Sequence, residues 1–114
     1  MGEPELQRLR DRLIERAVEQ VPGCEEGRVS TTGPLPYRRL DACGVALAYL
    51  HVRAGRRALR VDITGRWPVR PDGAHAVPWS AGAASFWVRS EEDAERVCRA
   101  LARAVRAASS PRAA

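Results

Sequence analysis

Residues 79–108 have the sequence WSAGAASFWVRSEEDAERVCRALARAVRAA, and this stretch decides the fold class. Positions 85–89 follow the two-residue period of a pleated strand, with Phe86 and Val88 on one side. Ser90 then stands where a helix N-cap belongs, followed by three acidic residues at the positive end of the helix dipole. The next apolar residues recur at intervals of three and four and form one stripe: Ala94, Val97, Cys98, Leu101, Ala104, Val105 and Ala108. The arginines lie on the other side: Arg96, Arg99, Arg103 and Arg106. The stretch therefore predicts a buried strand that leads into an amphipathic helix.

The beginning of the chain predicts a second amphipathic helix, over residues 5–21. Pro4 falls in its first turn, where a missing N–H costs nothing, and Pro22-Gly23 ends the helix. Arg10 lies at the edge of the apolar face, where its aliphatic stem can cover the core. The predicted buried face consists of Leu6, Leu9, Leu13, Ile14, Ala17, Val18 and Val21.

Between the two helices the sequence predicts short strands. Residues 28–32 and 37–41 are the shorter ones, and residues 44–53 and 57–63 are the longer ones. The longer pair is joined at Ala54-Gly55-Arg56, a loop of the length and composition that closes a β-hairpin.

A long irregular segment, residues 64–84, follows the hairpin and contains three prolines and two tryptophans. Segments of this length in compact domains serve as binding or covering elements. We expect Trp67 or Trp79 to be buried against the sheet, beside Trp87 or Tyr49, with its N–H on a backbone carbonyl or an acid. The segment then either closes over a ligand or forms a fixed wall.

An antiparallel sheet with a helix at each end of the chain is closed most economically by packing both helices on one face. We therefore predict an α+β fold: a two-layer sandwich in which an antiparallel sheet of about four or five strands carries the N- and C-terminal helices on one face. Residues 1–108 form a single domain, and residues 109–114 form a flexible C-terminal tail.

Charge and composition limit the classes of partner. The net charge is +5, but every basic residue is arginine, and the arginines are interleaved with acids along the chain. This pattern is typical of a chain encoded in a GC-rich genome, so nucleic acid is the less favoured partner. No apolar run approaches the roughly 20 residues that span a bilayer, and the N-terminus has no signal-peptide pattern. We expect a cytoplasmic protein with no membrane contact.

The three cysteines share no metal-binding or redox spacing. Cys98 falls on the apolar stripe of the last helix, whereas Cys24 and Cys43 fall in predicted loops. Three reduced thiols are therefore expected, and neither a cofactor nor a metal site is predicted.

No catalytic or phosphate-binding motif is present, so the candidate site comes from strand alternation. If Leu59, Val61 and Ile63 face the helices, Arg60 and Asp62 face away from them. The same register would place three further side chains with them: Tyr49, His51 and Trp87. Aromatic area combined with convergent polar groups is typical of small-ligand sites, of homodimer faces and of patches covered by a loop. The predicted ligand-binding residues are Tyr49, His51, Arg60, Asp62, Trp67, His75, Trp79 and Trp87.

Two resemblances bear on this prediction. The segments AYLHV, LRVDI, AHAVPW and SFWVRSEEDAERVCRAL, within residues 45–106, resemble the small bacterial domain named luciferase-like. The resemblance implies a strand with a histidine, a hairpin partner and a capped helix, but no established chemistry. Tyr49 and Arg53 stand two residues to either side of His51, where that family often has a second histidine. The opening ERAVEQVPGCEEG is similar to the start of MmcQ/YjbR-like proteins, which implies a small α/β fold.

The sequence predicts a small binding domain that acts through the open sheet face and the 64–84 segment, on a small molecule or a protein partner that could be a second copy. One alternative is an enzyme that uses His51 as a general base with Asp62 or Arg60. The other is an arginine-rich nucleic-acid-binding domain.

Overall fold

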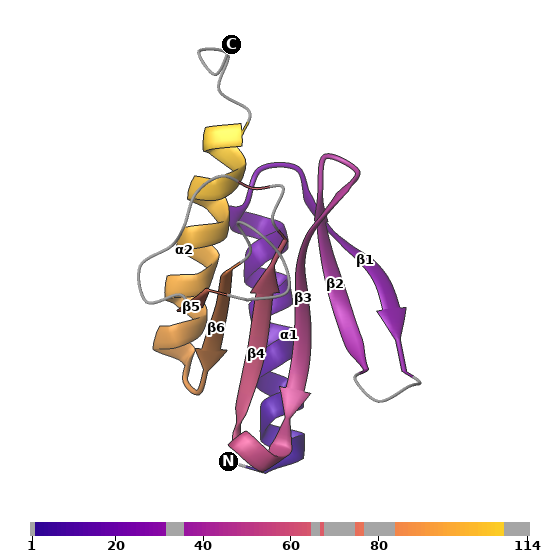
Figure 1. The fold of residues 1–114 in the computed structure, drawn as a ribbon, viewed down its shortest axis with the longest axis vertical. Coiled ribbons are helices and arrows are strands. Elements are labelled where there is room, and N and C mark those ends of the chain that lie inside the picture. The colour runs from indigo at the N-terminus through magenta and orange to yellow at the C-terminus, as the bar shows by residue number, and fades with distance from the viewer. Residues whose placement is uncertain (1, 32–35, 65–66, 68–74, 77–83, 109–114) are drawn as a thin grey trace.

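The structure is a computed structural model that describes residues 2–31, 36–64, 67, 75–76 and 84–108. Figure 1 shows the elements in chain order. They are α1 (Glu3–Gln20), β1 (Cys24–Ser30), β2 (Tyr37–Ala42), β3 (Val45–Arg53), the 3-10 helix η1 (Ala54–Arg56), β4 (Ala58–Ile63), β5 (His75–Ala76), β6 (Ala84–Val88) and α2 (Glu91–Ala108).

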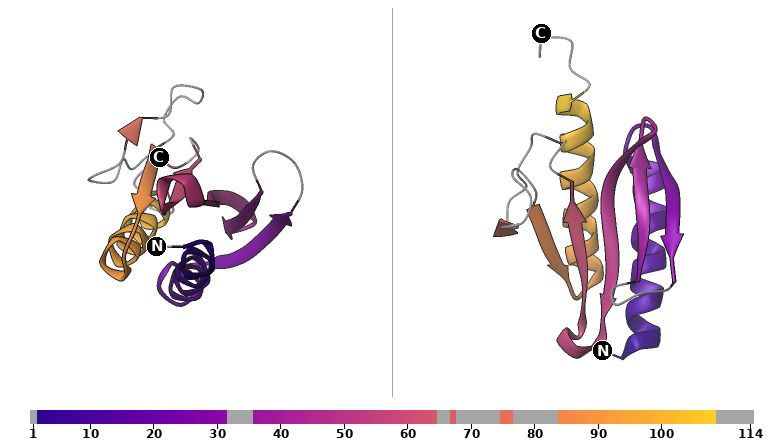
Figure 2. Two further views of the ribbon diagram at one scale, coloured as in Figure 1. Left: turned by 90° about the horizontal axis from the view of Figure 1, so that it is seen from below. Right: turned by 45° about the vertical axis from the view of Figure 1, so that its right-hand side comes forward.

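The strands form one sheet in the order β1-β2-β3-β4-β6-β5, and each neighbouring pair is antiparallel. Both helices pack on the same side of this curved sheet, as Figure 2 shows in its left view. The predicted α+β sandwich is therefore confirmed. The two-residue strand β5 lies within the segment that the sequence predicts to be irregular. Two residues are too few to show a strand period, so only its pairing with β6 identifies it.

Helix α2 begins as its capping residues predict. Ser90 Oγ accepts a hydrogen bond from the Asp93 amide at 3.1 Å, and Asp93 Oδ2 accepts one from the Arg89 amide at 2.9 Å. The apolar stripe is buried, except that Ala108 at the last residue of the helix is exposed. Ala100 and Ala102 are also buried, so the contact face is wider than the stripe.

Helix α1 packs against β1, β3 and β4, and its buried residues include Leu6, Leu13 and Ile14. Val18 was predicted to be buried, but 44% of it is exposed. It follows the buried Ala17 by one residue, which is a rotation of roughly 100° around the helix axis. That rotation carries Val18 past the edge of the apolar face.

Strand β1 begins earlier than predicted, at Cys24, and ends at Ser30 rather than Thr32. Cys24 is therefore a buried strand residue and not a loop residue. Strand β1 is polar because it lies at the sheet edge, where only backbone pairing with β2 is required.

Cys43 lies in a tight turn with Gly44, and both residues have positive φ, which is the geometry of a two-residue hairpin turn.

The pairing of β1 with β2 is irregular around Gly27, and this glycine makes room for the side chain of Asp41. A Cβ atom at Gly27 would lie 2.5 Å from Asp41 Oδ2 and 2.7 Å from Cγ. We expect Gly27→Ala to lower the free energy of unfolding by about 1–3 kcal/mol, because the Asp41 carboxylate must leave its position. Gly55→Ala is the matched control, since a Cβ atom there meets nothing within 4 Å. Urea denaturation of both variants measures the difference, and equal stabilities would contradict this packing.

Candidate functional site

Cross-strand pairing places one row of residues on the sheet face that points away from the helices, which we call the open face. The row contains Arg39, Tyr49, Asp62 and Ser85, from β2, β3, β4 and β6. The adjacent row contains His51, Arg60 and Trp87. The alternate residues Leu50, Val61 and Phe86 pair with one another and are buried in the core under the helices. The open face therefore brings together Tyr49, His51, Arg60, Asp62 and Trp87, as strand alternation predicts.

Asp62 is at the centre of this face and is 6% exposed. Its Oδ1 atom accepts a hydrogen bond from Nε of Arg60 at 2.8 Å, and its Oδ2 atom lies 3.4 Å from Nε2 of His51. Burial raises the pKa of Asp62, but the hydrogen bonds from His51 and Arg60 outweigh burial and leave the pKa below its usual value. Asp62 is therefore ionised at neutral pH and holds both neighbours in place.

His51 is 5% exposed, and both of its ring nitrogens face an acceptor. Nδ1 lies 3.2 Å from the carbonyl oxygen of Pro36, opposite the contact of Nε2 with Asp62. A neutral imidazole can donate to only one of these oxygens, whereas a protonated ring donates to both. A general base needs a ring nitrogen within reach of a substrate proton, and the two contacts of His51 leave it none.

A second buried carboxylate, Asp41, repeats this arrangement on β2. Arg39 binds it through Nε and Nη2, at 2.7 and 3.1 Å. The hydrogen bond to Asp41 holds the pKa of the Arg39 guanidinium above its usual value. Strand alternation alone did not predict this pair. The repeated pattern R-x-D, at residues 39–41 and 60–62, is the signal that could have found it.

Aromatic rings border both ends of the open face. Tyr37 packs edge-on against Tyr49, with ring centroids 5.0 Å apart, and lies 6.3 Å from the ring of His51. At the other end Trp87 has two guanidinium groups over its ring, those of Arg56 at 5.6 Å and Arg89 at 5.9 Å. Both contacts are within the range of cation–π interactions.

The predicted burial of a tryptophan from the 64–84 segment is confirmed for Trp67, which is 7% exposed. Its Nε1–H donates to the carbonyl of Ala46 at 3.0 Å, and the hydroxyl of Thr64 donates to the same oxygen at 3.0 Å. Trp67 therefore anchors the start of the segment on β3. Trp79 lies outside the described residues, and for His75 the structure describes only the pairing of its backbone with Ser85.

The open face is hollowed at the Tyr49 end. A shallow hollow of about 510 Å³, open to solvent, is lined by Arg39, Gly44, Val45, Ala46, Tyr49 and Thr64.

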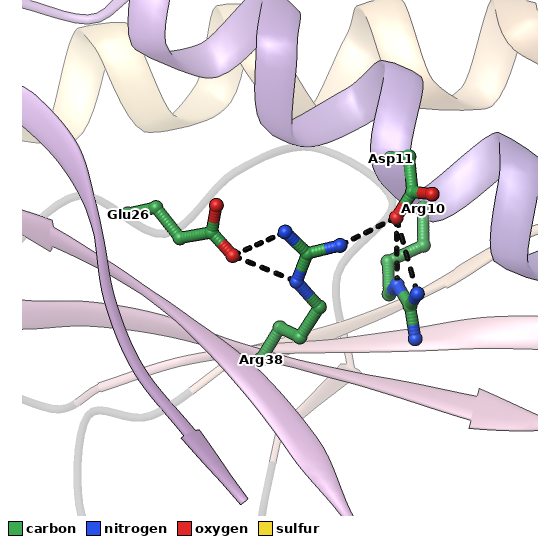
Figure 3. Close-up of polar contacts among 4 residues, drawn as sticks. All are labelled: Arg10, Asp11, Glu26 and Arg38. Atoms are coloured by element: carbon green, nitrogen blue, oxygen red, sulfur yellow. Dashed lines mark hydrogen bonds and ion pairs between the residues drawn. The ribbon is translucent and has the colours of Figure 1, made fainter.

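A second polar cluster, on the helix side, links α1 to β1 and β2 and is shown in Figure 3. Nη1 of Arg38 donates to Asp11 at 2.5 Å, and its Nε donates to Glu26 at 2.7 Å, with Nη2 on the same Glu26 oxygen. Arg10 binds Asp11 through Nε and Nη2, at 3.2 and 3.1 Å. All three guanidinium nitrogens of Arg38 are occupied, so this cluster serves as a structural contact.

The thiols offer no reactive group in the core. Burial raises the pKa of Cys24 and that of Cys98 to about 11, so both are protonated at neutral pH. Within the described ranges, no group of three or more His, Cys, Asp or Glu residues could hold a metal ion.

No helix in the described part of the chain is long and apolar enough to cross a membrane. Comparisons of this chain with family models, with curated proteins and with solved structures found no match.

Proposed function

We propose that this protein is a small binding domain whose binding surface is the open face of the sheet. The observation that carries the proposal is the fixed arrangement around Asp62, which orients Arg60 beside Trp87. The buried carboxylate of Asp62 holds the partly exposed guanidinium of Arg60 next to the ring of Trp87. A side chain held in this way loses little conformational entropy when a partner binds. A small molecule or a protein partner, including a second copy of the chain, would meet the same groups.

The geometry favours binding over catalysis. In the alternative enzyme, His51 would act as base with Asp62 or Arg60 as its orienting group. Both ring nitrogens of His51 already contact protein oxygens, and the side chain is buried. The histidine therefore serves to position Asp62, and Asp62 to position Arg60.

The geometry also disfavours the arginine-rich nucleic-acid alternative, because many arginines on the helices are matched by acids. Arg12 and Arg16 of α1 form ion pairs with Glu91 and Glu95 of α2. Arg96 pairs with Asp93 at 3.3 Å. Neutralised arginines contribute little to the phosphate contacts that dominate non-specific binding.

The 64–84 segment enters the proposal through its anchored start. Thr64 and Trp67 are tied to Ala46, at the edge of the hollow beside Tyr49. We propose that these two residues border the binding surface at this point.

A screen of ring-containing fragments by saturation-transfer NMR tests the proposal. We expect Trp87→Ala to weaken binding of the fragment hits by at least about tenfold, because the ring supplies the largest apolar area beside Arg60. Val18→Ala is the control, since it removes exposed apolar area from α1 instead. Sedimentation velocity on the same variants shows whether a second copy is the partner: a dimer that Trp87→Ala dissociates would identify it. An unchanged set of hits in Trp87→Ala would contradict the proposal.

A further inference from the structure

We infer that the open face binds an anionic ligand that carries a planar ring, with its carboxylate or phosphate group on Arg60 and its ring against Trp87. This inference rests on the proposed function and adds the chemical class of the ligand. It is based on the charge around Arg60 and Trp87, on the Nη groups of Arg60 and on the surroundings of the Trp87 indole.

Charge on the strands around Arg60 and Trp87 is one-sided, although Asp93 at the start of α2 accepts a hydrogen bond from the Arg89 amide. Strands β3, β4 and β6 and the turn η1 contain a single carboxylate, that of Asp62. The same elements contain Arg53, Arg56 and Arg60, and Arg89 directly follows β6. Asp62 is buried and already bound by Arg60 and His51, so it presents little negative charge to a ligand. The accessible charge beside Trp87 is therefore positive, which favours an anion.

Arg60 is oriented to bind an anionic group of a ligand. Its Nε atom is held by Asp62 at 2.8 Å, while Nη1 and Nη2 make no hydrogen bond with the part of the chain that the structure describes. The side chain is 26% exposed and pairs across the sheet with His51 and Trp87. A guanidinium fixed through Nε offers its two Nη groups to both oxygens of one oxyanion. Arg38 differs, because carboxylates occupy all three of its nitrogens.

Trp87 supplies the second half of the site. It is half-buried on the open face, and Arg56 and Arg89 lie over its ring. In the described ranges neither guanidinium forms an ion pair with a carboxylate, so both remain available to an anion near the indole. A planar ligand can stack on or beside the indole while its negative group is drawn to Arg60.

The exposed arginines of α2 form the rival surface. Arg99, Arg103 and Arg106 border a shallow hollow of about 310 Å³ with Gln20 and Ala102. Among the described residues, no aromatic side chain lines that hollow and no buried carboxylate orients its arginines. It lacks both features that distinguish the Arg60 site, and its arginines provide controls of equal charge.

Titration of the 114-residue chain with 1-naphthyl phosphate tests the inference. The NMR signals of the Trp87 indole N–H and the Arg60 Nε–H report the binding. The comparison probes are 1-naphthoate, 1-naphthol and inorganic phosphate. We expect both naphthyl anions to shift the Trp87 and Arg60 signals and to bind at least about tenfold more tightly than naphthol or phosphate alone. The stronger of the two naphthyl anions identifies phosphate or carboxylate as the preferred group.

Arg60→Lys is expected to weaken naphthyl phosphate binding by about fivefold, because a lysine cannot form the bidentate contact. Arg60→Gln, which also removes the charge, is expected to weaken it by at least about tenfold. Arg103→Gln removes the same charge from α2 and should change naphthyl phosphate binding by less than about twofold. Thermal unfolding of each variant confirms that it folds. Equal binding of naphthol and naphthyl phosphate at the open face would overturn the anionic ligand but leave the open face as the binding surface. Shifts confined to the arginines of α2 would overturn both.

Discussion

Replacing Leu101 by alanine is expected to lower the free energy of unfolding by about 2–5 kcal/mol. Leu101 is on the face of α2 that packs into the core, and it is 0% exposed. Its neighbours in the core include Val97 and Val105, one turn away on either side. Truncation therefore removes buried methyl groups and leaves a cavity that the packed helix and sheet can fill only in part.

The matched controls lie on the opposite face of the same helix. Arg99→Ala and Arg103→Ala should change the free energy of unfolding by no more than about 0.5 kcal/mol, because both side chains are exposed. Urea denaturation of the three variants, with the slope of each transition compared, gives the answer. Similar losses in all three would mean that α2 faces the core with a different set of residues.

The second large effect is expected at Asp62. Asp62→Asn keeps the shape of the side chain but removes the charge that Arg60 and His51 both contact. We expect a loss of about 1.5–3 kcal/mol at neutral pH, the range for hydrogen bonds to charged groups. Asp11→Asn is the control: its carboxylate is 48% exposed, so its ion pairs with Arg10 and Arg38 should contribute less than about 1 kcal/mol.

The pH dependence of the Asp62 effect has a definite sign. Because hydrogen bonds hold the folded-state pKa of Asp62 below its usual value, the carboxylate contributes stability above the unfolded pKa of about 3.9. That contribution is lost as the pH falls through the lower, folded-state pKa. The difference in free energy of unfolding between the wild type and Asp62→Asn should therefore have its full size at pH 6 and become smaller below about pH 4. A difference that grows in acid would show that Asp62 is protonated in the folded protein.

The sequence predicted the elements that carry their own periodicity. The strand at Phe86 and Val88, the cap at Ser90 and the buried stripe of α2 follow from local rules, and so does the hairpin at residues 54–56. Alternation along β4 was enough to place Arg60 and Asp62 on the open face, because a strand buried on one side has its register fixed by its apolar residues.

What the sequence could not predict depends on contacts between distant segments. Strand β1 is polar because it lies at an edge, and the position of Asp41 against Gly27 depends on an irregularity in pairing. The contact of His51 with the carbonyl of Pro36 joins residues 15 positions apart. That contact decides against a general base, and no spacing in the sequence indicates it.

The Asp62 network holds Arg60 in a fixed orientation on the open face. ¹⁵N relaxation of the arginine Nε–H groups measures this directly, without a ligand. We predict an order parameter for Arg60 near that of rigid backbone, about 0.85, and values below about 0.6 for the exposed Arg103 and Arg106. Asp62→Asn should lower the Arg60 value toward theirs. An Arg60 side chain as mobile as Arg103 in the wild-type protein would contradict the account.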